Sequence, residues 1–124
     1  MGSEKKNRRH KVVTHLGEAL KRYDADSSEL NFLTVCKALE NLMEQEWRDL
    51  KRSVEGEGLE ANSPRSAFRQ AAKLGLIEEP EAWLDALEAR NNSVHDYFGI
   101  TEKEYIDLAR TVLGLALKKP LPDD

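Results

Sequence analysis

The stretch RNNSVHDY, residues 90–97, holds side chains that can act on a phosphodiester without a metal. The His95 imidazole exchanges a proton near neutral pH, and the Arg90 guanidinium keeps a fixed positive charge suited to phosphate oxygens. RNA cleavage needs both functions. A base takes the proton of the ribose 2′-hydroxyl, and a cation stabilises the charge that develops on the phosphate oxygens. These residue types are therefore compatible with metal-independent RNA cleavage.

The spacing places these side chains in two adjacent polar stripes of an amphipathic helix. Arg90 and Tyr97 lie within about 20° of each other around the helix axis, and Asn91 and His95 within about 40°. Spacing alone favours a plainer alternative, a polar helix edge with Arg90 paired to a carboxylate such as Glu88 or Asp85. His95 would then make a routine hydrogen bond, because lone arginines and histidines are common on helices. One histidine does not easily serve as both base and acid, whereas two copies across a two-fold axis can. For the catalytic alternative we therefore expect a homodimer.

Three cations upstream are spaced four residues apart. Arg65, Arg69 and Lys73 share one face of a helix and can follow a phosphate backbone or hold a nucleotide. A solvated helix face with nearby glutamates explains them equally well. A further basic cluster precedes residue 12, and we expect residues 1–8 to be flexible; its members are Lys5, Lys6, Arg8, Arg9 and Lys11.

Composition indicates one soluble domain spanning residues 1–124. The chain is 40% apolar and 34% charged, and its net charge of −4 excludes a general basic field, so any RNA contact must be local. The single cysteine, Cys36, cannot form an intramolecular disulfide, and its apolar neighbours predict burial. No apolar run reaches the length of a membrane span, and no signal peptide is recognisable, so we expect a cytoplasmic protein without membrane contact. The histidine spacing predicts no metal site, and we expect no cofactor.

Apolar spacing predicts two long helices in the first half of the chain. The first carries an apolar stripe from Val12 to Tyr23, and Ser27 or Ser28 caps the second. The second helix keeps three- and four-residue spacing over about seven turns. Its predicted stripe is Leu33, Cys36, Leu39, Met43, Trp47, Leu50 and Val54.

Three further helices follow from start and stop signals. Ser63–Pro64 begins the third helix, and Gly75 ends it in a left-handed conformation. Pro80 begins a fourth helix, predicted to run to Phe98, and 101–104 form a capping box before a fifth helix that ends ahead of Pro120. The short connections predict an all-α fold, an antiparallel up-and-down bundle of four to five helices.

An ordered set of these residues resembles the nucleotidyltransferase substrate-binding family, which belongs to the HEPN (higher eukaryote and prokaryote nucleotide-binding) group of domains. The resemblance covers residues 63–77, SPRSAFRQAAKLGLI, and residues 81–97, EAWLDALEARNNSVHDY, with a looser match in the second helix. The second helix departs from the family pattern, because Leu39, Asn41 and Met43 stand where relatives often carry phenylalanines.

The resemblance implies a HEPN-type bundle that dimerises and is paired with a cognate minimal nucleotidyltransferase. Several relatives form toxin–antitoxin pairs in which the helical protein is a metal-independent ribonuclease with an R-x-x-x-x-H motif. The nucleotidyltransferase silences it by transferring AMP to the tyrosine of H-x-Y. By position, the resemblance implies that Arg90 and His95 are catalytic, that Asn91 supports them, and that Tyr97 accepts AMP.

The older family name implies the alternative, a noncatalytic subunit that binds substrate or nucleotide for a two-component nucleotidyltransferase. The presence of Arg90, His95 and Tyr97 does not distinguish the ribonuclease from the noncatalytic binding subunit. The chain lacks the Gly-Ser turn followed by paired aspartates that would hold magnesium for nucleotidyl transfer. It is therefore not expected to be the nucleotidyltransferase itself.

Overall fold

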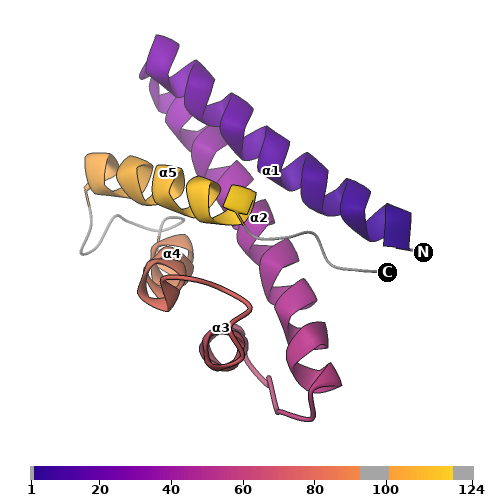
Figure 1. Cartoon of the computed structure of the whole chain (residues 1–124). Helices are drawn as coiled ribbons and strands as arrows, with labels where there is room; N and C mark the ends of the chain where they lie inside the picture. Colours follow the sequence, from indigo (N-terminus) through magenta and orange to yellow (C-terminus); the bar gives the residue numbers. More distant parts are fainter. Residues whose placement is uncertain (1, 93–100, 119–124) are drawn as a thin grey trace.

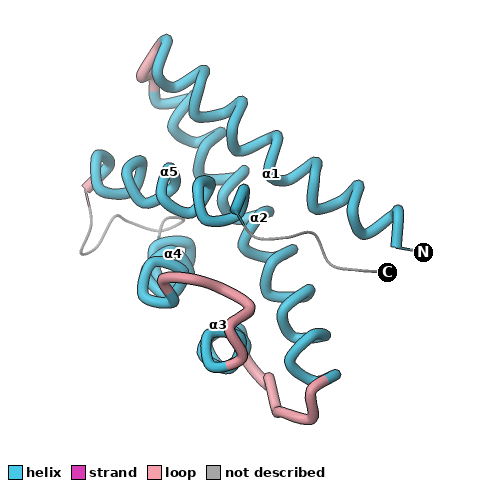
Figure 2. Tube along the Cα trace, viewed as in Figure 1, coloured by secondary structure: helices cyan, strands magenta, loops and turns pink. Residues whose placement is uncertain are grey.

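Five helices form the structure, a computed structural model that describes the backbone of residues 2–92 and 101–118 and the side chains of residues 8–89 and 101–118. The helices are α1 (Gly2–Ala25), α2 (Glu29–Gly56), α3 (Pro64–Lys73), α4 (Pro80–Asn92) and α5 (Glu102–Lys118). Figure 2 shows helices joined by loops, with no strand in these two ranges. The predicted all-α helical bundle is confirmed.

Helix α2 is the centre of the bundle. It contacts each of the other four helices. Figure 1 shows α1 and α2 as a long antiparallel hairpin, with α5 crossing it and α3 and α4 viewed nearly end-on. The two short helices that carry the candidate site residues therefore pack on one side of this hairpin.

The helix starts follow the capping signals of the sequence. The Ser28 hydroxyl accepts the Asn31 N–H at 3.1 Å, and the Ser63 hydroxyl accepts the Ser66 N–H at 3.1 Å. These side chains satisfy N–H groups that have no partner inside a helix. Before α5, the Thr101 N–H donates to Glu104 Oε1 at 3.0 Å and the Glu104 N–H donates to Thr101 Oγ1 at 3.1 Å, which confirms the capping box.

Glycines in a left-handed conformation end α2 and α3. Gly75 has φ +74°, with its N–H donating to the Ala72 carbonyl and the Leu76 N–H to the Ala71 carbonyl. Gly58, at φ +84°, ends α2 with the same pair of bonds. This Schellman arrangement needs a residue at positive φ, where a side chain is strained. The prediction for Gly75 is confirmed.

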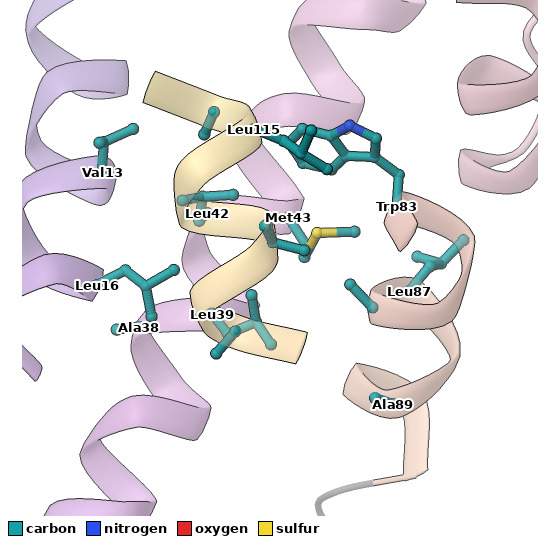
Figure 3. Close-up of a cluster of buried hydrophobic side chains, with 14 of the residues drawn as sticks. Val13, Leu16, Ala38, Leu39, Leu42, Met43, Trp83, Leu87, Ala89 and Leu115 are labelled. Atoms are coloured by element: carbon teal, nitrogen blue, oxygen red, sulfur yellow. The ribbon is translucent and has the colours of Figure 1, made fainter. Parts of the chain in front are cut away.

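The core joins all five helices through large apolar side chains. Figure 3 shows Leu39, Leu42 and Met43 of α2 between α1 on one side and Trp83 and Leu87 of α4 on the other, with α5 crossing in front of them. All five are at most 4% exposed. The stacked pair of Phe68 and Trp83 links α3 to α4, with ring centroids 5.6 Å apart and planes inclined by 18°.

The predicted stripe of α2 is wrong at its beginning. Leu33 is 47% exposed, whereas the neighbouring Phe32 and Val35 are buried. Phe32 packs edge-on against Tyr105 of α5, with centroids 5.5 Å apart. The covered face of α2 is thus rotated toward α5, and Cys36, predicted to be buried, is half-buried.

Arg9 does not belong to a surface cluster. It is 4% exposed, and its Nε donates to Glu46 Oε1 of α2 at 3.0 Å. Its Nη2 donates to the Ala116 carbonyl of α5 at 2.6 Å. Helix α1 begins at Gly2, ahead of the predicted apolar stripe. The flexibility of residues 1–8 stays a prediction.

Exposed polar contacts hold the other end of α1 against α5. The Arg110 guanidinium binds both carboxylate oxygens of Asp24, and the Tyr23 hydroxyl donates to Glu102. The hydrogen bond from Arg110 lowers the pKa of Asp24. The hydrogen bond with Glu102 raises the pKa of Tyr23. The two contacts therefore depend on whether Asp24 and Tyr23 are protonated.

Candidate functional site

The three cations of α3 line one groove. Arg65, Arg69 and Lys73 are all exposed, and the groove between α3 and the start of α4 has a volume of about 460 Å³. Ser66 and Gln70 of α3, together with Pro80, Glu81 and Leu84 of α4, complete its walls. The predicted face of α3 therefore exists, and the structure adds a second wall.

The packing of α3 explains why the cations point outward. Ala67, Phe68 and Ala71 are fully buried and lie on the opposite side of the helix. Because the helix repeats every 3.6 residues, burying that side leaves 65, 69 and 73 on the exposed side. The Phe68–Trp83 stack fixes α3 against α4 and thereby sets the width of the groove.

The charges of this groove are uncompensated. None of Arg65, Arg69 and Lys73 forms an ion pair with another residue in the described ranges, whereas Lys37, Arg48, Lys51 and Lys103 pair with a carboxylate three or four residues away. The alternative of a solvated face neutralised by nearby glutamates thus loses support. The one acid of the groove, among residues that the structure describes, is Glu81.

Helix α4 carries two of the residues predicted to be catalytic. Arg90 and Asn91 lie in its last turn, and the structure describes their backbone alone. By helical register, position 90 follows Trp83 and Ala86 on the buried side of α4, and position 91 follows Leu84 on the side that borders the groove. His95 and Tyr97 lie outside the described residues, as does the predicted continuation of the helix to Phe98.

Binding, rather than catalysis, is what the described groove residues can perform. Guanidinium and ammonium groups form charge-assisted hydrogen bonds with phosphate oxygens, and serine and glutamine side chains add neutral ones. No histidine lies among the described groove residues. Within the described ranges, no three histidine, cysteine or acidic residues are placed to hold one metal ion.

Comparison with known proteins identifies the family. The model of the family described as nucleotidyltransferase substrate binding protein like matches residues 6–112. The chain belongs to this family. The match spans α3, the groove, the whole of α4 and most of α5. A search of the curated proteins finds no match.

In this member of the nucleotidyltransferase substrate-binding family, the sequence identified one wall of the groove and not the other. Leu84 and Glu81 carry no functional signal, because they read as ordinary residues in the first turns of a helix. Ser66 and Gln70 follow the cations by one residue each, and this repeat is the signal that extends the polar face. Among the helices that the structure describes, none is long and apolar enough to cross a membrane.

Proposed function

We propose that the chain is the substrate-binding subunit of a two-component nucleotidyltransferase and that its groove holds a phosphate-bearing substrate. The observation that carries the proposal is the set of three exposed, unpaired cations, Arg65, Arg69 and Lys73, along one wall of a groove. The family name adds the partner, a nucleotidyltransferase. The resemblance noted in the sequence implies a cognate minimal one.

Local charge makes the groove selective for anions. The chain as a whole has a net charge of −4, so a polyanion is repelled by most of the surface and attracted to this patch. Successive cations lie one helical turn apart, about 6 Å along the helix axis. Their long, flexible side chains can converge on the phosphate groups of a nucleotide or follow the phosphate backbone of an RNA strand.

Titration calorimetry with inorganic triphosphate and with ATP, at low salt, tests the proposal. We expect binding by the isolated chain and tighter binding once the nucleotidyltransferase is present, because the partner supplies the magnesium ligands that this chain lacks. Affinity should fall steeply as salt rises. The proposal would be overturned if neither triphosphate nor ATP bound to the isolated chain or to the chain together with the nucleotidyltransferase.

The pattern R-N-x-x-x-H-x-Y favours a second candidate function, a HEPN-type toxin-like ribonuclease that the nucleotidyltransferase silences. Arg90 and Asn91 lie in the last turn of α4, and position 91 is on the same side of the helix as Leu84, about two turns beyond the groove. In this scheme His95 takes the proton of a ribose 2′-hydroxyl, and Arg90 stabilises the charge on the phosphate. A homodimer in the cytoplasm would supply the second His95 as acid. The groove cations would then hold the RNA backbone.

A further inference from the structure

A second groove follows the seam between the two helices of the α1–α2 hairpin. It has a volume of about 470 Å³, and among the residues that the structure describes its walls come from α1 and α2 alone. Helix α5 contacts both α1 and α2 but lines no part of this groove within the described ranges. The groove therefore lies on the face of the hairpin that α5 leaves uncovered.

The hairpin groove combines small side chains in its walls with a protruding leucine on one rim. Ala19 of α1 and Ala38 of α2 line it, and Leu33 on the α2 rim is 47% exposed. Leu30, one turn earlier on α2, is 73% exposed. Alanines let another helix approach closely, and a leucine beside them can fill the matching space in a facing surface. One patch thus supplies both parts of a two-fold contact, the side chain that inserts and the space that receives it.

Opposite charges on the two rims of the hairpin groove are also self-complementary. The Arg9–Glu46 pair sets the register of the antiparallel hairpin. Glu18 follows the arginine by nine residues and Lys37 precedes the glutamate by nine, so these two groove residues lie about level on opposite rims. Each forms an exposed ion pair with a neighbour on its own helix, at 3.9 Å and 3.6 Å respectively. Exposed pairs of this kind are weak, so both charges are available to a facing surface.

We propose that the hairpin groove is the interface between two copies of the chain, related by a two-fold axis parallel to the hairpin. This axis preserves height along the hairpin and places the α1 rim of each copy on the α2 rim of the other. Glu18 of each copy then meets Lys37 of the other copy. By the same register, Leu33 faces Arg22 of the other copy, whose aliphatic stem covers it.

The direction of this axis follows from the charges. An axis across the hairpin would bring Glu18 onto Glu18 and Lys37 onto Lys37, which is repulsive. The parallel axis also gives every helix antiparallel neighbours, as in a four-helix bundle. The interface uses no residue of α3 or α4, so it is independent of the proposed phosphate groove.

Sedimentation equilibrium of the full chain tests the interface. We expect a dimer at tens of micromolar protein. Leu33→Glu places two carboxylates in the interface and should weaken dimerisation about a hundredfold, because each substitution occurs twice across a two-fold axis. Leu117→Glu changes an exposed leucine of α5 and is the matched control, which should leave the dimer unchanged. Circular dichroism checks that both variants keep their helicity.

Two charge variants test the pairing of the rims. Glu18→Lys brings lysine against lysine and Lys37→Glu brings glutamate against glutamate, so each variant alone should dimerise about tenfold more weakly. Mixed in equal amounts, the two variants should form a heterodimer, because every rim contact then joins a lysine and a glutamate. A native chain that stays monomeric at tens of micromolar, a dimer that Leu33→Glu leaves intact, or charge variants that do not associate on mixing would each overturn the proposal.

Discussion

Arg9 and Glu46, which lie 37 residues apart in the chain, form a buried ion pair with 3.0 Å between Nε and Oε1. The same arginine donates to the Ala116 carbonyl. One side chain thus connects α1, α2 and α5. Its burial makes the pair sensitive to loss of either partner, because the remaining buried charge loses a direct ion-pair contact.

Arg9→Met should therefore destabilise the protein by about 3–5 kcal/mol in urea unfolding, since it leaves Glu46 without its guanidinium. The exposed neighbour Arg8 provides the matched control, and Arg8→Met should change the free energy of unfolding by about 0.5 kcal/mol or less. Joint replacement, Arg9→Met with Glu46→Leu, should restore part of the loss. Equal effects of Arg9→Met and Arg8→Met would contradict this account of the pair.

The contact between Asp24 and Arg110 should make stability depend on acid pH. Arg110 lowers the pKa of Asp24 in the folded state, so the contact stabilises the fold above the ordinary aspartate pKa, about 3.9, and this contribution disappears as the pH falls through the lowered value. Thermal unfolding of the native chain and of Arg110→Gln should differ near neutral pH and converge at about pH 2. Arg52→Gln, which changes an exposed arginine of α2, serves as the control. A constant difference between native and Arg110→Gln across the range would refute the assignment.

Charge removal along α3 should weaken phosphate binding in steps. Arg65→Gln, Arg69→Gln and Lys73→Gln should each lower the affinity for inorganic triphosphate about three- to tenfold, and the triple variant should show no measurable binding. The same titrations in rising salt should give a shallower slope for each variant. Arg52→Gln controls for net charge. If it weakens binding as much as Arg69→Gln does, the effect is not local to the groove.

The ribonuclease candidate makes a prediction about His95. His95→Ala should abolish RNA cleavage by the purified protein while leaving helicity unchanged in circular dichroism, because the variant removes the proposed base. Chelator should have no effect on the native activity, since no metal takes part in the scheme. Cleavage that persists in His95→Ala, or that stops on chelation, would exclude this mechanism and leave the binding-subunit function in place.

Tyr97 should accept AMP if the nucleotidyltransferase silences the chain. Incubation with the cognate nucleotidyltransferase, ATP and magnesium should add the mass of AMP at Tyr97, and Tyr97→Phe should escape modification. The added phosphate places negative charge next to the Arg90–His95 stretch, so RNA cleavage should fall in proportion to the modified fraction. Peptide mass spectrometry that finds Tyr97 unmodified beside a demonstrably active partner would argue against this form of control.

Local signals in the sequence predicted most of the helix boundaries. Ser63–Pro64, Gly75 and the Thr101–Glu104 pair act on the backbone within a few residues, so their effect does not depend on the rest of the fold. The face of α2 at Leu33 was not predictable in this way. Either Leu33 or Phe32 satisfies the periodic pattern, and the position of Tyr105 on a distant helix decides between them.

The candidate site was likewise predictable only where its residues belong to one helix. Spacing on α3 was enough to place Arg65, Arg69 and Lys73 on one face, because all three belong to one helix. The opposite wall of the groove comes from α4, and it depends on the Phe68–Trp83 stack, which no local pattern specifies. Arg9 was assigned to a basic tail for the same reason. Its partners, Glu46 and Ala116, are 37 and 107 residues away.

The bond from Arg9 to the Ala116 carbonyl also sets an order of events during synthesis. The α1–α2 hairpin can form once residue 56 has been made. Arg9 cannot bind its second acceptor, the Ala116 carbonyl, until α5 has been made, because Ala116 follows Arg9 by 107 residues. Until then the face of α2 that carries Phe32 lacks its contact with Tyr105 of α5 and stays open to water. The nascent chain thus presents a long, half-covered hairpin, and folding is completed only after translation has passed α5.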